Sequence, residues 1–178
     1  MKIIVGAGMP GSGKGLLTKA ASELGLPIII LGDLVREKAK EWGISPLEAG
    51  QRIRDENGPA GVAKLALEKL KGIKGDVVYI DGVRSRHEIE EFKKLGDVVV
   101  IAIHASPKVR FKRLYKRGRP DDPKTWEEFV ARDEKELSRG LAKVIARADF
   151  VIDNNDEGEE TVYKECIEKI KKALNRDP

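Results

Sequence analysis

Residues 8–14 read Gly8-Met9-Pro10-Gly11-Ser12-Gly13-Lys14, between the apolar run 2–7 and an amphipathic segment. The spacing Gly-x4-Gly-Lys in this setting is that of a phosphate-binding P-loop. Its glycines let successive backbone N–H groups face an anion, and the N-terminus of the following helix adds partial positive charge. We expect the nucleotide phosphates to be bound by Gly8, Met9, Pro10, Gly11, Ser12, Gly13, Lys14, Gly15 and Leu16.

Apolar runs alternate with amphipathic stretches along the whole chain, a pattern typical of parallel strands joined by crossover helices. The runs are short and rich in Val and Ile, as expected for strands covered on both faces. The sequence therefore predicts one α/β domain over residues 1–178, a three-layer P-loop NTPase with a five-stranded parallel sheet. The expected strands are residues 2–7, 27–31, 77–81, 98–103 and 150–153.

Two stretches fall outside this alternation. Residues 33–72, approximately, hold several helical patterns between two strands, and residues 116–125 combine Gly, Pro and charge. Ligands of open α/β sheets bind beyond the carboxyl ends of the strands. We therefore expect both stretches to be mobile inserts that cover a site at that edge.

Composition narrows the class of protein. Charged residues make up 36% of the chain, and both signs are mixed around a net charge of +4. Because the charges are mixed and no aromatic side chains lie between the basic ones, we do not expect a nucleic-acid partner. Cys166 is the only cysteine, which excludes an internal disulfide, and no apolar run is long enough to span a membrane. We therefore expect a cytoplasmic protein.

The residue after the P-loop lysine departs from the usual pattern. A Ser or Thr commonly stands there and binds magnesium, but this chain has Gly15. Asp81 ends the apolar run 77–81 at the edge of the sheet where ligands are expected. Because Mg²⁺ gives up its water reluctantly, we expect Asp81 to hold Mg²⁺ through water.

The P-loop, with its proline and with Gly15 after the lysine, resembles that of adenylate kinases and other nucleoside monophosphate kinases. Gly32-Asp33-Leu34-Val35-Arg36 is similar to the segment that opens the acceptor-binding insert of those kinases. Asp81-Gly82-Val83-Arg84 is similar to their Asp-Gly strand end, although the arginine comes one residue earlier than in adenylate kinase. The resemblance implies that Asp33, Arg36 and Arg84 bind the acceptor.

The resemblance continues into the second insert, which would be a short lid. Arg113 and Arg117 resemble the arginine pair that enters the lid, and Arg119-Pro120-Asp121-Asp122 with Arg132 resembles the residues that leave it. Residues 148–154 resemble the last strand of dephospho-coenzyme A kinases. As a whole, the chain resembles a small archaeal family described as adenylate-kinase-related or dephospho-coenzyme-A-kinase-like.

Arginine suits phosphoryl transfer, because its planar fork binds phosphate oxygens and keeps its charge when desolvated. Arg110, Arg113 and Arg117 recur at i, i+3 and i+7, so one helix face carries three guanidinium groups. We expect this face to point into the lid, while Phe111, Leu114 and Tyr115 face the core.

These observations predict a kinase that uses ATP and Mg²⁺ to phosphorylate a nucleotide-like small molecule, foremost a nucleoside monophosphate. Its catalytic residues would be Lys14, Asp81, Arg119 and Arg132, with Arg113 and Arg117 on the nucleotide. Dephospho-coenzyme A is the alternative acceptor, because a hydroxyl acceptor needs a carboxylate base and Asp33 and Asp81 are available. An NTPase or switch acting on a nucleic-acid or protein partner is the alternative of another class. Either a monomer or a homodimer fits the sequence.

Overall fold

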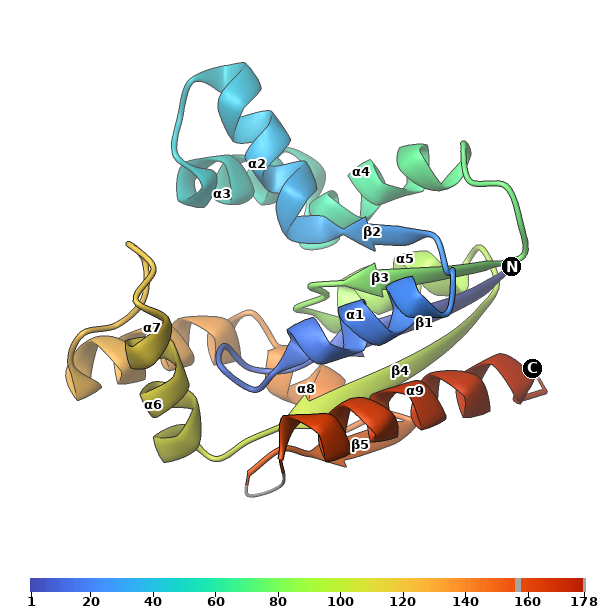
Figure 1. Ribbon diagram of the computed structural model, residues 1–178. Coiled ribbons are helices and arrows are strands. Elements are labelled where there is room, and N and C mark those ends of the chain that lie inside the picture. Colours follow the sequence, from blue (N-terminus) through green and yellow to red (C-terminus); the bar gives the residue numbers. More distant parts are fainter. Residues whose placement is uncertain (156–157, 178) are drawn as a thin grey trace.

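The computed structural model describes residues 1–155 and 158–177, and its centre is a single five-stranded sheet (Figure 1). All strands are parallel, in the order β2-β3-β1-β4-β5. The α/β fold and the five parallel strands predicted from the sequence are thus confirmed. The strands are β1 (Lys2–Ala7), β2 (Ile28–Ile30), β3 (Val77–Asp81), β4 (Asp97–His104) and β5 (Phe150–Asp153).

Helices cover both faces of the sheet. Helices α1 and α9 pack on one face, and α5 and α8 pack on the other (Figure 1). Helices α2, α3 and α4 lie together beside β2, and α6 and α7 lie beyond the carboxyl ends of the strands. Their bounds are α1 (Lys14–Glu23), α2 (Leu31–Trp42), α3 (Pro46–Asn57), α4 (Gly61–Leu70), α5 (Arg86–Lys93), α6 (Pro107–Arg117), α7 (Trp126–Ser138), α8 (Leu141–Ile145) and α9 (Glu159–Asn175).

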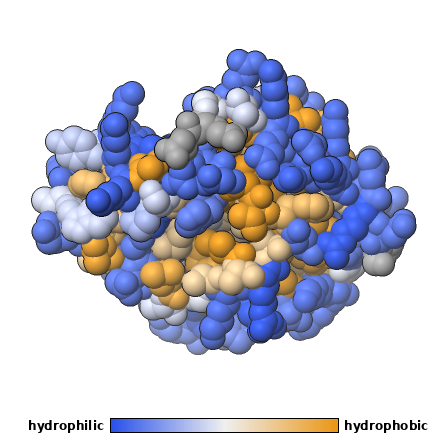
Figure 2. All heavy atoms as spheres, turned by 90° about the horizontal axis from the view of Figure 1, so that it is seen from below, coloured by the Kyte–Doolittle hydropathy of each residue, from blue (hydrophilic) through white to orange (hydrophobic). Residues whose placement is uncertain are grey.

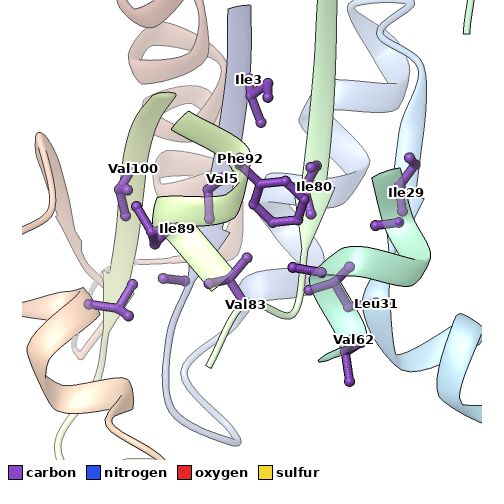
Figure 3. Close-up of a cluster of buried hydrophobic side chains, with 14 of the residues drawn as sticks. Ile3, Val5, Ile29, Leu31, Val62, Ile80, Val83, Ile89, Phe92 and Val100 are labelled. Carbon is purple, nitrogen blue, oxygen red and sulfur yellow. The ribbon is translucent and has the colours of Figure 1, made fainter. Parts of the chain in front are cut away.

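The two-residue period of the strands explains why two cores form. Along β1, Ile3 and Val5 enter one core and Ile4 enters the other. In the first core, Val5 lies among side chains of β3 and β4 and close to Phe92 of α5 (Figure 3). Phe92 is fully buried, so this layer excludes water behind the strands.

The second core joins the sheet to α1 and α9. Leu17 of α1 and Ile170 of α9 are fully buried against Ile4 and Tyr79 of the sheet. β5 is an edge strand, and its Val151 is 54% exposed. Figure 2 shows the molecule from below, where apolar side chains lie in the middle of the visible face and hydrophilic ones surround them.

Several helices begin with their own side-chain caps. Ser45 and Glu48 form a capping box at α3, and Ser85 and Glu88 form another at α5. Thr125 Oγ1 accepts from the backbone N–H of residue 128 at α7. Within residues 1–155 and 158–177, no helix has the length and apolar character that crossing a bilayer requires.

Candidate active site

A cavity of about 460 Å³ lies at the carboxyl edge of the sheet, between the P-loop, α2 and the α6–α7 region. β1 stands at the point where the strand order reverses, and ligands of open α/β sheets bind at such points. Most of the residues predicted from the sequence line this cavity, namely Gly8, Met9, Pro10, Gly11, Gly13, Lys14, Gly15, Arg36, Asp81, Arg84, Arg113, Arg117, Arg119 and Arg132. Ser12, Leu16 and Asp33 are not part of its lining.

The N-terminus of α1 opens into the cavity. Gly13 precedes this helix with φ +103°, in the left-handed region that favours glycine. No side chain among the described residues caps α1, and the first turn of this helix holds no acidic residue. Its first N–H groups therefore remain available to an anion, together with the positive end of the helix dipole.

Side chains far along the chain hold the carbonyl groups of the P-loop. Three successive carbonyl oxygens each accept a hydrogen bond from such a side chain. The bonds run from Arg110 Nη1 to Pro10 O (3.2 Å), from Arg113 Nη1 to Gly11 O (3.4 Å) and from Asn154 Nδ2 to Ser12 O (2.8 Å). These hydrogen bonds fix the backbone of the loop, and its N–H groups can form the phosphate cradle.

Lys14 and Asp81 face each other across the floor of the cavity. Asp81 pairs in register with Gly6 of β1, which places its carboxylate beside the start of the P-loop. Lys14 Nζ lies 4.0 Å from Asp81 Oδ1. Asp81 Oδ1 is buried and has no hydrogen-bond partner within the described residues. A buried carboxylate oxygen without a hydrogen-bond partner is suited to accept a hydrogen bond from a water molecule of hydrated Mg²⁺. The Mg²⁺ ion would neutralise phosphate charge.

Asp122 organises the segment between α6 and α7 by accepting hydrogen bonds from three of the predicted arginines, from two side chains and one backbone N–H. Its carboxylate, 2% exposed, accepts hydrogen bonds from Arg117 Nε (2.8 Å), Arg119 N (3.0 Å) and Arg132 Nη1 (3.2 Å). The Arg117 guanidinium in particular lowers the pKa of the Asp122 carboxyl to about 2. Asp122 thus connects the short segment between α6 and α7 to both helices and orients Arg132 along the cavity.

Asp122→Asn is expected to lower the free energy of unfolding by about 1–2 kcal/mol at pH 7, an amount reduced because Arg117 is partly exposed. The pKa of Asp122 falls from 3.8 to about 2 on folding, so its contribution is present above pH 4, approximately, and is lost as the pH drops toward 2. Chemical denaturation at several pH values measures the difference between variant and wild type.

Asp121→Asn is the matched control, because the Asp121 side chain is 74% exposed and its Oδ2 lies 3.6 Å from Arg132. This variant should change the unfolding free energy by less than about 0.5 kcal/mol. An Asp122→Asn deficit that stays constant down to pH 2 would show that the charge of Asp122 is not what stabilises the lid.

The predicted basic face of α6 is wrong for Arg110. Arg110 is 4% exposed, donates to both carboxylate oxygens of Asp133 on α7, and its Nε donates to Ala105 O at 3.0 Å. It therefore joins α6, α7 and the P-loop, and it does not line the cavity. Tyr115, expected in the core, is 62% exposed, whereas Leu114 is buried. The helical spacing predicted the face, but Asp133 decides where Arg110 points.

The Asp33 and Arg36 side chains bind each other on the first turn of α2. Both are exposed, and only Arg36 lines the cavity. Arg84 reaches the cavity from the loop after β3, and its backbone N–H donates to the buried Glu88 carboxylate at 2.7 Å. Burial raises the pKa of Glu88, and this hydrogen bond opposes the rise. Arg36 and Arg84 thus add positive charge to the cavity that the P-loop also lines.

The sequence predicted no role for two residues of the site, Glu136 and Asn154, although Asn154 ends the stretch 148–154 that resembles the last strand of dephospho-coenzyme A kinases. Glu136 lines the cavity from α7, and Asn154 holds the P-loop from the end of β5. Glu136 stands four residues after Arg132, which is the helical spacing that places two side chains on one face. That spacing was a usable signal, whereas nothing local marks Asn154, which lies 142 residues from its partner Ser12.

The fold and the site together define a P-loop nucleotide-binding domain with a kinase-like α/β architecture. The chain belongs to the AAA domain family, whose sequence model matches residues 7–130, and to the UPF0200 proteins. It is 47% identical to a UPF0200 protein of Pyrococcus abyssi, over 94% of each chain. It is 45% identical to one of Hyperthermus butylicus, over 98% of this chain and 94% of that protein.

Solved structures share the architecture at low sequence identity. TT1252 from Thermus thermophilus matches with a TM-score of 0.71 and 17% identity, over 98% of both chains. Shikimate kinase from Bacteroides thetaiotaomicron matches with a TM-score of 0.58 and 18% identity, over 99% of both chains. These likenesses show the fold alone, which is a P-loop kinase fold like that of shikimate kinase.

Proposed function

We propose that the protein is an ATP-dependent phosphotransferase that moves the γ-phosphoryl group of ATP to a nucleotide-like acceptor, foremost a nucleoside monophosphate. The observation that carries this proposal is that one cavity is lined both by the P-loop with Lys14 and by two arginines from other elements, Arg36 of α2 and Arg84 of the loop after β3. Phosphorylating a phosphate requires two anion sites within reach of each other.

Charge neutralisation is the chemistry this arrangement supports. The transferring phosphoryl group spreads negative charge over its oxygens, and positioned cations stabilise it without covalent steps. Lys14 would contact the outer phosphates of ATP, and Arg119 and Arg132 would approach from the lid side of the same cavity. Mg²⁺ bound with ATP would add positive charge, with Asp81 holding its water.

Dephospho-coenzyme A stays the alternative acceptor because Asp81 is a carboxylate at the cavity floor. A hydroxyl acceptor would need such a group to take its proton. The same cavity and the same ATP site would serve both acceptors, so an assay with each acceptor distinguishes them.

The test is an ATP-consumption assay with AMP, CMP, UMP, GMP, dTMP and dephospho-coenzyme A, each against ATP alone. We expect at least one acceptor to raise the rate by about tenfold or more, because the acceptor completes the closed site. For acceptors other than AMP, the phosphorylated product should form in equal amount to ADP, and with AMP two ADP should form for each ATP consumed. Slow ATP hydrolysis that no acceptor changes would favour an NTPase or switch and would contradict the kinase proposal.

A further inference from the structure

Glu136 places a carboxylate in the wall of the cavity among arginines. Its side chain is 10% exposed and lies one helical turn beyond Arg132, which lines the same cavity. Glu136 Oε1 accepts a hydrogen bond from Arg139 Nη1 at 3.1 Å. Glu136 Oε2 is buried, lies 3.5 Å from Arg84 Nε, and has no hydrogen-bond partner within the described residues.

Glu136 Oε2 forms an ion pair with Arg84 but accepts no hydrogen bond within the described residues, so it retains its capacity to accept one. Leaving a buried acceptor without a hydrogen bond costs roughly 1–3 kcal/mol, and more for a charged group. A cavity that binds only phosphate oxygens gains nothing from Glu136, because like charges repel. The oxygen is instead suited to accept a hydrogen bond from a donor group on the bound molecule.

The position of Arg84 indicates which donor group this is. Because Glu136 Oε2 lies 3.5 Å from Arg84 Nε, its ligand group must stand next to whatever anion Arg84 binds. In a nucleoside monophosphate, the sugar is attached directly to the phosphate, whereas the amino groups lie farther away on the base. A sugar hydroxyl is therefore the donor that both residues can reach together.

We propose that Glu136 is a specificity-determining residue that accepts a hydrogen bond from a ribose hydroxyl of the acceptor, beside the phosphate bound by Arg84 and Arg36. This inference rests on the proposed kinase function and narrows its acceptor to ribonucleotides over deoxyribonucleotides. A merely structural role would limit Glu136 to neutralising Arg84 and Arg139. The two roles differ in one measurable respect, because only the first makes acceptor choice depend on the carboxylate.

The experiment compares kcat/KM for each accepted ribonucleoside monophosphate with its 2′-deoxy and 3′-deoxy forms. The wild type should prefer the ribo form over one deoxy form by about 10- to 100-fold, the effect of a hydrogen bond to a charged group. Glu136→Ala should reduce that preference to less than about twofold. Glu136→Gln keeps the shape of the side chain and should lie between the two, and it replaces the alanine variant if that variant does not fold.

Glu134→Gln is the matched control, because Glu134 is an exposed residue of the same helix. It should keep the wild-type preference, and all variants should bind ATP with unchanged affinity. A wild type that accepts ribo and deoxy forms equally, or a Glu136→Ala protein that still discriminates, would overturn the inference and leave the kinase function standing. Acceleration by dephospho-coenzyme A alone would also overturn it, since the ribose hydroxyl is then the attacking group. If no acceptor accelerates ATP consumption, the proposed function fails and the inference fails with it.

Discussion

Lys14→Ala is expected to lower acceptor-stimulated ATP consumption by about 10³-fold, the scale of removing one preorganised charge at a developing anion. Lys14 is the first residue of α1, and its ammonium group reaches the cavity floor, 4.0 Å from Asp81 Oδ1. No other residue type in the cradle supplies a mobile positive charge at this point, because the remaining P-loop positions are Gly, Met, Pro and Ser. The measurement is the steady-state rate with saturating ATP and the best acceptor.

Lys19→Ala provides the matched control for this variant. Lys19 belongs to the same helix, is exposed, and lies over the Tyr163 ring at 4.6 Å, outside the cavity lining. It should keep the wild-type rate to within about twofold. If Lys14→Ala also stays within tenfold of the wild type, the P-loop is not where the transferred phosphate is stabilised.

Asp133→Ala is expected to destabilise the protein by about 3–5 kcal/mol, the usual result of removing one partner of a buried ion pair. Arg110 Nη1 lies 2.7 Å from Asp133 Oδ1, and its Nη2 lies 2.5 Å from Oδ2. With Arg110 only 4% exposed, truncating Asp133 would leave a buried charge without its counter-ion. Chemical denaturation measures the loss, and Glu134→Ala on the same helix should lose less than about 0.5 kcal/mol.

Combining Arg110→Met with Asp133→Leu separates stability from P-loop geometry. Apolar residues can replace a buried ion pair without net loss, so the double variant should recover a large part of the stability lost in Asp133→Ala. It should still bind ATP about 2- to 10-fold more weakly, because Pro10 O loses its donor. Full stability together with unchanged ATP affinity would refute the view that Arg110 positions the cradle.

The segments that could be predicted from sequence are those in which neighbouring residues carry the information. β1 covers the predicted residues 2–7, and α1 begins at Lys14 as the P-loop pattern requires. β2 is shorter than its apolar run because Leu31 already starts α2, and β4 extends one residue beyond each predicted end to Asp97 and His104. The apolar period is a strong local signal, whereas element ends depend on pairing with neighbouring strands.

The candidate site divides in the same way. The cradle and Asp81 were predictable because strand, turn and helix follow one another directly and Asp81 ends a strand. The partners of the arginines were not predictable, since a guanidinium group on a long side chain can pair with a carboxylate that is distant in sequence but close in the fold. Asp133 draws Arg110 into the core, and Asp122 holds Arg117.

The amino-acid sequence by itself determined the P-loop, the parallel sheet and the edge at which ligands bind, because these follow from backbone freedom at glycine and from short-range apolar periodicity. Only the tertiary structure decided which partners the charged and polar side chains around the cavity bind. Glu136, Arg110 and Asn154 acquire their roles from partners distant in sequence, and the strength of a buried charge or hydrogen bond depends on which groups share its enclosure.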